Sequence, residues 1–338
     1  MSKNYTTMEE LEKELGEYTK GESLVPIIGS KAKDIVISHK DLREKPVKPL
    51  KYILHPIIPE DGYLLLHAAA GVGKTYFALN IAYAIAQGGR FLEFVAPEPK
   101  KILYIDSEMG QDAVHRRMEK IESIQGKLYF DNLHYLFYDN FPNGKMPKID
   151  TISGRQFYIT YLIENNFDGV VFDNLKTMTT MDENKTKEWD EIQDDLIIFL
   201  RKKNIFTILL HHSCSGDPSK QRGTSARIDV AHFVISLQAF EDENGKKNKI
   251  KFNYQKTRET EGVSFVDFIV LNNFDGSFKV LELENEFEQK VYYYYQRGVK
   301  KPMDIQRAIE KDGVKCYPKK VYRAFEELEK KGYLTFIK

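Results

Sequence analysis

Short apolar runs alternate with amphipathic stretches through the middle of the chain. Four of these runs predict buried strands, at residues 63–67, 101–106, 169–173 and 205–211. Between them, apolar positions at the spacing of an α-helix predict helices at 75–86, 111–124, 151–165 and 188–203. Strands that alternate with helices in this order favour an α/β fold built on a parallel sheet.

The pattern changes after residue 212. A polar loop covers 213–223, and loops of that length often carry function. Apolar or alternating runs then predict further strands, at residues 230–237, 249–256, 265–271 and 278–283. The pair Asp275-Gly276 marks a tight turn between the last two. We expect these strands to be antiparallel and to lie at the far edge of the sheet.

The N-terminal part, residues 1–51, is polar and charged. Its one short amphipathic stretch contains Met8, Leu11 and Leu15 at helical spacing. Pro46-Val47-Lys48-Pro49 predicts an extended linker into the core. We interpret 1–51 as a peripheral arm or subunit-packing segment, followed by the α/β core at residues 52–285.

The remaining residues, 286–338, form a separate unit. Helical spacing is found over 287–297, 304–311 and 317–331, and a strand pattern follows at 333–337. A helix–turn–helix followed by a strand is typical of a winged helix. The sequence therefore predicts a small C-terminal winged helix-turn-helix domain.

Composition supports a globular protein, because 42% of the residues are hydrophobic and 30% are charged. No apolar stretch approaches the roughly 20 residues that cross a bilayer, and the first residues lack a signal-peptide core. We therefore expect a cytoplasmic protein without a membrane partner. The two cysteines, Cys214 and Cys316, are too few for a disulfide framework or a Cys-rich zinc site.

A phosphate-binding loop is predicted where the strand at 63–67 leads into the helix at 75–86. The connecting sequence is Ala68-Ala69-Ala70-Gly71-Val72-Gly73-Lys74-Thr75. Small residues let backbone N–H groups turn inward around a polyphosphate, and the helix N-terminus adds its dipole. The residues expected to contact the nucleotide are Ala70, Gly71, Val72, Gly73, Lys74, Thr75 and Tyr76.

This loop predicts the ligands ATP and Mg²⁺. Lys74 should reach the β- and γ-phosphates, and the Thr75 hydroxyl should bind the metal. The alternative is an ordinary Gly-rich strand–turn–helix without a ligand.

Acidic residues end two of the predicted strands. Asp173 ends the strand at 169–173 and could support Mg²⁺, because ligands gather at the carboxyl ends of parallel strands. Glu108 follows the strand at 101–106, where a carboxylate can polarise the attacking water. The alternative is that Asp106 or Glu108 only caps the helix that begins near Gly110.

Two histidines, His211 and His212, end a third strand. His212 is the better candidate to hydrogen-bond a γ-phosphate and to sense its hydrolysis. Metal binding is less attractive, since adjacent side chains on a strand point to opposite faces. A buried histidine with satisfied hydrogen bonds is the alternative.

The order and spacing of five motifs resemble those of the RecA-like ATPases related to plasmid RepA and to DnaB-type helicases. The motifs lie at 68–75, 104–108, 170–173, 211–212 and 222–225, within a resemblance that covers residues 52–283. The resemblance implies a ring, usually a homo-hexamer, with nucleotide at each subunit interface. It also implies that Lys74 and Thr75 bind phosphate and Mg²⁺, Glu108 activates water, Asp173 supports Mg²⁺ and His212 is the sensor.

Such ATPases complete each site with a finger, a basic side chain that reaches the γ-phosphate of a neighbouring subunit. Lys256-Thr257-Arg258 resembles the Lys-x-Arg finger of DnaB-type helicases, and we favour Lys256 and Arg258. Arg222, in the polar loop with Lys220, is the competing candidate. We expect 213–222 to face single-stranded DNA in the ring channel, and simple solvated charge is the alternative for both clusters.

The C-terminal unit is modestly basic. Residues 286–338 contain 13 Lys and Arg against 8 Asp and Glu, a balance of +5 in a chain of zero net charge. The residues expected to contact DNA there are Lys315, Lys319, Lys320 and Arg323. Winged helices also serve as protein-binding modules, so that reading stays open. The four tyrosines at 292–295 point in every direction around a helix, which favours half-buried packing over a stacking platform.

We interpret the chain as a ring-forming, Mg²⁺-dependent ATPase on DNA, a helicase or translocase of a plasmid, phage or other mobile element. One alternative is an ATP-regulated DNA-binding regulator or maintenance protein without helicase activity. A small-molecule P-loop kinase is a weaker alternative, because 216–222 is a poor candidate for its arginine-rich lid.

Overall fold

The computed structural model describes most of the chain from Val36 onward. The described residues are 36–47, 49–126, 130–181, 186–214, 220–222, 226–240, 248–258, 265, 267–272, 277–281, 285–311, 314, 316–331 and 333–334. The amphipathic stretch with Met8, Leu11 and Leu15 lies outside these ranges, as do Lys315 and the predicted strand from residue 335 onward. The described part of the N-terminal arm contains one short helix, α3 (His39–Glu44).

The core is built on a mixed sheet whose described strands pair in the order β13-β12-β11-β10-β3-β9-β8-β6-β7. The parallel strands are β3 (Tyr63–Ala68), β6 (Ile102–Asp106), β7 (Leu133–Phe137), β8 (Gly169–Asp173), β9 (Phe206–His212) and β10 (Phe233–Phe240). The antiparallel strands are β11 (Lys249–Thr257), β12 (Phe268–Asn272) and β13 (Phe278–Leu281). This confirms the predicted α/β class with a mostly parallel sheet, to which β7 is an additional edge strand.

The orientation predicted for the strand at 230–237 was wrong. That segment forms β10, which runs parallel to β3, with Phe233 opposite Leu64 and Leu237 opposite Ala68. The physical reason is the connection, because a parallel neighbour needs a crossover of a dozen or more residues. Residues 213–232 supply that length and include the short helix α10 (Ala226–Asp229). Antiparallel pairing therefore begins only with β11.

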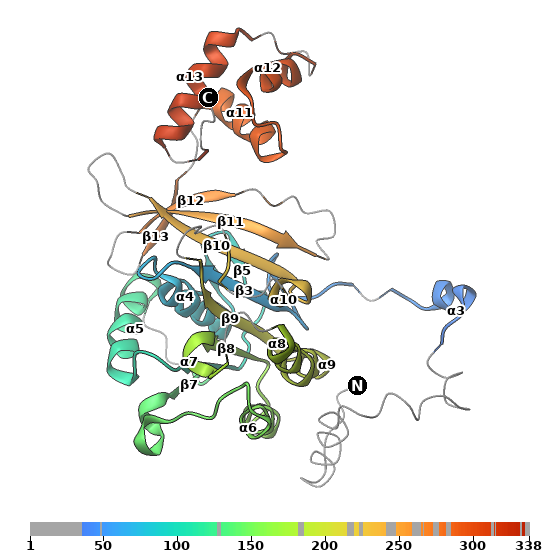
Figure 1. Cartoon of the computed structure of the whole chain (residues 1–338), viewed down its shortest axis with the longest axis vertical. Coiled ribbons are helices and arrows are strands. Elements are labelled where there is room, and N and C mark those ends of the chain that lie inside the picture. Colours follow the sequence, from blue (N-terminus) through green and yellow to red (C-terminus); the bar gives the residue numbers. More distant parts are fainter. Residues whose placement is uncertain are drawn as a thin grey trace.

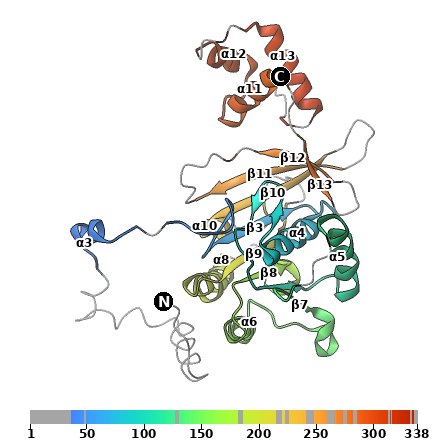
Figure 2. The same ribbon diagram turned by 180° about the vertical axis from the view of Figure 1, so that it is seen from behind.

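Helices cover both faces of the sheet (Figures 1 and 2). One face packs with α4 (Lys74–Gln87) and α5 (Gln111–Gln125) in an apolar core that includes Leu64 and Leu66 of β3. Tyr63 and Leu65 of the same strand belong to the core of the opposite face. The helices on that face are α6 (Ile152–Glu164), α7 (Leu175–Met178), α8 (Thr186–Ile192), η4 (Gln193–Ile198) and α9 (Phe199–Lys202). Side chains on both faces of β3 are buried, as expected for a parallel strand.

The helix predicted over 188–203 is interrupted by η4, a wider π-helical segment. At this segment Asp195 pairs with the buried guanidinium of Arg155, at 2.9 Å. Smaller elements complete the core. They are the two-stranded sheets β1 (Tyr52–Leu54) with β2 (Ile58–Pro59) and β4 (Arg90–Phe91) with β5 (Phe94–Val95), and the 3₁₀ turns η2 (Tyr138–Asn140) and η3 (Pro142–Gly144).

Three C-terminal helices lie beyond the antiparallel edge of the sheet (Figure 1). They are α11 (Glu286–Gln296), α12 (Pro302–Lys311) and α13 (Pro318–Lys330). Their buried side chains form a third apolar core around Val291, Ile305 and Phe325, which also includes Ile269 of β12. The helix pattern matches the sequence prediction. The strand that would complete a winged helix lies mostly outside the described residues, so the winged helix stays a prediction.

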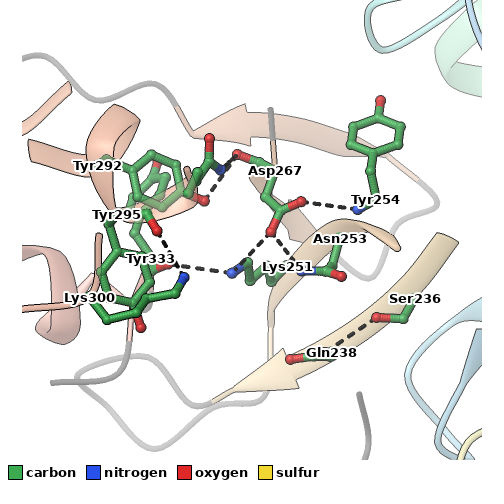
Figure 3. Close-up of polar contacts among 11 residues, drawn as sticks. Ser236, Gln238, Lys251, Asn253, Tyr254, Asp267, Tyr292, Tyr295, Lys300 and Tyr333 are labelled. Carbon is green, nitrogen blue, oxygen red and sulfur yellow. Dashed lines mark hydrogen bonds and ion pairs between the residues drawn. The ribbon is translucent and has the colours of Figure 1, made fainter. Parts of the chain in front are cut away.

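Asp267 links these helices to the sheet (Figure 3). Its carboxylate accepts hydrogen bonds from Asn253 Nδ2 at 2.6 Å and from the Tyr254 N–H at 3.0 Å, and lies 3.3 Å from Lys251 Nζ. Its backbone carbonyl accepts from the Tyr292 hydroxyl and from Gln296 Nε2 of α11. One residue beside β12 therefore holds both β11 and α11.

The tyrosines at 292–295 differ in environment, as their helical positions predict. Tyr292 is buried against Tyr333, with ring centroids 5.1 Å apart, whereas Tyr293 is 43% exposed. In the part of the chain that the structure describes, no helix is long and apolar enough to span a membrane.

Candidate functional site

The P-loop connects a fully buried strand to a buried helix. Ala68 is the last residue of β3, and α4 begins at Lys74. Gly71 and Gly73 lie at positive φ, 78° and 109°, and Gly73 is the N-cap of α4. Because a Cβ disfavours such φ values, glycine is the residue that lets the loop turn there. The N-terminus of α4 therefore lies close to the carboxyl end of β3, where it favours an anion.

A cavity of about 370 Å³ opens in front of this loop. It has the size of a small-molecule site. Its lining residues are Ala70, Gly71, Gly73, Lys74, Thr75, Tyr76, Glu108, Met109, Arg117, Lys120, Asp173, Asn174, His212 and Asn272. The residues predicted for phosphate, metal, water and sensor roles thus converge on one cavity, except that Val72 packs against the adjoining apolar core.

Lys74 is nearly buried at the start of α4. Burial lowers the pKa of its ammonium, while the carboxylates of Asp173 and Glu108 raise it in part. Its Nζ lies 3.4 Å from His212 Nδ1. A lysine can only donate, so Nδ1 of His212 accepts and its Nε2 carries the proton. Lys74 and the Nε2–H of His212 can therefore both act as donors to phosphate oxygens.

Asp173 and Thr75 supply a pair of oxygen donors beside Lys74. The Asp173 carboxylate accepts from the Tyr104 hydroxyl at 2.7 Å and from the side chain of Thr75. Burial raises the pKa of Asp173 to about 6. A buried carboxylate next to a hydroxyl fits a hard cation that prefers oxygen ligands and keeps its own waters, as Mg²⁺ does. The residues present therefore fit the predicted metal.

The two acids at the end of β6 have different environments. Asp106 is buried, and its Oδ1 accepts from the backbone N–H groups of Met109 and Gly110, at 2.8 and 2.7 Å. Glu108 is exposed to the cavity, and its Oε2 accepts from Asn174 Nδ2. Asp106 therefore holds the turn before α5, and Glu108 is the acid available for a water.

The two histidines also separate. His211 is buried, and its Nε2 contacts the Arg222 carbonyl oxygen at 2.7 Å and Arg227 at 3.2 Å. Burial and the Arg227 cation lower its pKa to about 3, so it is neutral. His212 lies on the opposite side of the strand and lines the cavity. The sensor role remains a prediction for His212.

The two candidate fingers lie at opposite ends of the sheet. The Arg258 N–H donates to the His232 carbonyl, and the His232 N–H donates to the Tyr63 carbonyl, so Arg258 is level with the start of β3. Ala68 is five residue steps along the strand from Tyr63, a distance of about 17 Å. Lys256 Nζ donates to the carbonyl oxygens of Ile228 and of Asp229 at the end of α10.

Arg222, in contrast, lies at the carboxyl end of β9. Its backbone N–H donates to the His212 carbonyl at 2.9 Å, and its side chain is exposed. Lys220 is also exposed, and its carbonyl accepts from the Cys214 N–H. The structure thus brings Arg222 to the cavity end of its own subunit and Arg258 to the far end.

The basic residues predicted to contact DNA on α13 are also exposed, at Lys319, Lys320 and Arg323. Lys320 Nζ lies 4.2 Å from the centroid of the Phe287 ring, which holds it against α11. Lys315, the fourth residue of that prediction, is outside the described residues.

Several residues of the site were not predicted. Asn174 directly follows the strand that ends in Asp173, and a polar residue there is a signal that could have identified it. Tyr104 gave no such signal, because its partner Asp173 is on a neighbouring strand. Arg117 and Lys120 of α5 were not singled out in the sequence, yet both line the cavity, and the Arg117 guanidinium lies 5.0 Å from the Tyr76 ring centroid.

The solved structures that resemble the chain include two at low sequence identity. The KaiC-like protein PH0186 from the hyperthermophilic archaeon Pyrococcus horikoshii OT3 is 18% identical, with a TM-score of 0.46 over 69% of this chain and 100% of its own. The second structure, an ATPase domain, is 16% identical, with a TM-score of 0.48 over 66% of this chain and 86% of its own. No curated protein sequence matches.

The model of the AAA domain family matches residues 30–217. That range includes the P-loop, Glu108, Asp173 and His212, and it is more than half of the chain. In the sheet, β9 lies between the P-loop strand β3 and the Asp173 strand β8, with β6 beyond, which is the strand arrangement of a RecA-like P-loop ATPase core. Because the family model covers more than half of the chain, the protein belongs to the AAA domain family.

Proposed function

We propose that the protein is a Mg²⁺-dependent ATP hydrolase that acts on DNA as a ring, as a helicase or translocase. The observation that carries the proposal is the convergence of Lys74, Thr75, Glu108, Asp173 and His212 on one cavity in front of the P-loop. Each of these residues has the chemistry that one part of ATP hydrolysis needs.

The reaction follows from their positions. The P-loop backbone and Lys74 hold the triphosphate, and Thr75 and Asp173 would hold Mg²⁺, which neutralises charge on the β- and γ-phosphates when bound. Glu108 accepts a proton from water as the water oxygen bonds to the γ-phosphorus. The bond from that phosphorus to the bridging oxygen breaks, and ADP and phosphate are released. Asn174 orients Glu108, and His212 donates to the γ-phosphate.

A finger from a second subunit completes the site. Arg258 lies about 17 Å along the sheet from its own P-loop, beyond the reach of an arginine side chain. Head-to-tail contact between identical subunits places one end of a subunit against the opposite end of the next, and such contacts close into rings. This arrangement supports Lys256 and Arg258 as trans-acting groups, which stabilise transition-state charge. Lys256 would leave the carbonyl oxygens of α10 when it engages a neighbour.

DNA contact is proposed at two places. Lys220 and Arg222 belong to the loop that leaves β9 directly after His212, so a change at the sensor can move them. Lys319 and Arg323 are exposed on α13. The second place also supports the alternative function, a regulator that binds duplex DNA. Specific duplex binding without unwinding or DNA-stimulated hydrolysis would favour that alternative.

Mixing two inactive variants tests the trans finger. Lys74→Ala removes the phosphate contact of a pocket, and Arg258→Ala removes the finger, so each variant alone should lose hydrolysis. In a mixed ring, an interface is active when the intact pocket of an Arg258→Ala subunit meets the intact finger of a Lys74→Ala subunit. Because contacts are head to tail, random equimolar mixing places this pair at about one interface in four. It should therefore restore up to about a quarter of wild-type activity.

The control is the same mixture with Arg222→Ala in place of Arg258→Ala. Restoration only with Arg222→Ala would assign the finger to Arg222. No restoration with either variant would contradict a shared site.

A further inference from the structure

His67 is a buried histidine in the otherwise apolar strand that leads into the P-loop. It is fully buried, one residue before Ala68. Burial of a polar ring is unfavourable unless its nitrogens are hydrogen-bonded. Both nitrogens of His67 have a partner, and neither partner belongs to β3.

The two partners come from different elements. His67 Nδ1 lies 2.9 Å from Ser213 Oγ, and His67 Nε2 lies 2.8 Å from Gln255 Oε1. Burial lowers the pKa of His67, so the ring is neutral. The amide oxygen of Gln255 can only accept, so Nε2 donates to it and Nδ1 accepts from the Ser213 hydroxyl. The ring therefore forms a directed bridge from Ser213 to Gln255.

Gln255 reaches His67 because β11 carries a β-bulge. Val234 of β10 pairs with Lys256, but the next residue, Ile235, pairs with Tyr254, so Gln255 is the extra residue. A bulge re-aims a side chain and bends the strand locally. Here the amide crosses β10, which lies between β11 and β3. The bend at Gln255 also sets the direction of the last residues of β11.

One end of the bridge adjoins the nucleotide site, and the other end adjoins the proposed finger. Ser213 follows the candidate sensor His212, and its N–H donates to the Ala68 carbonyl where the P-loop begins. Gln255 precedes Lys256, and Arg258 follows two residues later. A shift of His212 on loss of the γ-phosphate would pass through Ser213 and His67 to the bulge.

We propose that His67 is a positioning residue that couples the nucleotide site of one subunit to the finger it presents to the next. The proposal rests on the proposed function, because it needs Arg258 to act in trans. Through this bridge, the state of one site sets the rate at the neighbouring site.

Gln255 is the side chain to change, because it is exposed and its replacement should leave the fold intact. Gln255→Met removes the acceptor at similar length, and Gln255→Glu keeps an acceptor for Nε2. The matched control is Gln238→Met on β10, where the amide instead donates to Ser236 Oγ at 3.2 Å (Figure 3). kcat and KM for ATP would be measured for each variant, alone and combined with Arg258→Ala.

Gln255→Met should lower kcat by about 10- to 100-fold, the loss that misplacing a catalytic group by about 1 Å produces. KM should stay within about twofold, Gln255→Glu should recover most of the loss and Gln238→Met should behave as wild type. In the Arg258→Ala background, Gln255→Met should cause no further loss of the residual hydrolysis, because the bridge acts through the finger. A purely structural role would not produce this dependence on Arg258.

Two results would overturn the proposal, and they differ. If Arg258→Ala lowers kcat but Gln255→Met is neutral, or multiplies that loss, the bridge is wrong and the finger stands. If Arg258→Ala itself has no effect, both the finger and the coupling through His67 are wrong.

Discussion

Asn174 provides a sharp test of how the site holds its catalytic acid. Its side chain has two functions: Nδ2 donates to Glu108, and Oδ1 accepts from the Thr177 N–H at 3.3 Å as the N-cap of α7. Asn174→Ala removes both. Asn174→Asp keeps the cap, since aspartate caps helices as well as asparagine does, but loses the donor and adds a charge beside Glu108.

The magnitudes follow from these two bonds. A hydrogen bond to a charged group contributes about 1.5–3 kcal/mol, and its loss in the transition state lowers kcat by about 10- to 150-fold. Loss of the cap costs about 1 kcal/mol of unfolding free energy. We therefore expect both variants to lose hydrolysis, and only Asn174→Ala to lose stability.

Phosphate release at saturating ATP and Mg²⁺ measures the first effect, and urea unfolding measures the second. Glu108→Gln is the reference, because Asn174→Asp should cause little further loss in that background. Wild-type kcat in Asn174→Asp would refute the idea that Asn174 positions Glu108.

Three further predictions concern the loop, the buried acid and the C-terminal helices. Gly73→Ala places a Cβ at φ 109°, so the affinity for an ATP analogue in equilibrium titration should fall at least about tenfold; an unchanged affinity would mean that the loop does not need glycine there. Asp173→Asn should stabilise the nucleotide-free, metal-free protein. Its folded pKa of about 6 exceeds the ordinary 3.8, so ionisation costs stability as pH rises from about 4 to 6. The gain, up to about 3 kcal/mol at pH 8 and absent at pH 3, would be read from urea unfolding, and equal gains at both pH values would contradict it. Asp267→Ala leaves Lys251 without its carboxylate and should lower the unfolding free energy by about 1–3 kcal/mol, with earlier proteolysis between the sheet and α11; unchanged unfolding and proteolysis would mean that Asp267 does not anchor these helices.

The parts of the site that sequence analysis predicted are those encoded locally. β3, the glycines after it and α4 are consecutive, so their pattern predicts a P-loop. Asp173 and Glu108 each end an apolar run, and parallel strands bring such ends to one edge. The presence of Lys74, Asp173 and Glu108 in one cavity follows from those rules.

The remaining features depend on which strands are neighbours. The bonds from Tyr104 to Asp173 and from His67 to Gln255 join strands that are far apart in sequence, and no local pattern encodes them. The direction of β10 is set by the length of its crossover, and its apolar run would suit either orientation. The distance of Arg258 from its own P-loop likewise appears only when β11 is placed in register.

The most direct test of the proposed function is ATP hydrolysis with and without single-stranded DNA, measured together with the mass of the protein in solution. We predict a ring whose hydrolysis is stimulated by single-stranded DNA, and an Arg258→Ala protein that keeps the ring but loses the activity. A monomer or dimer whose turnover is indifferent to DNA and to Arg258→Ala would contradict it.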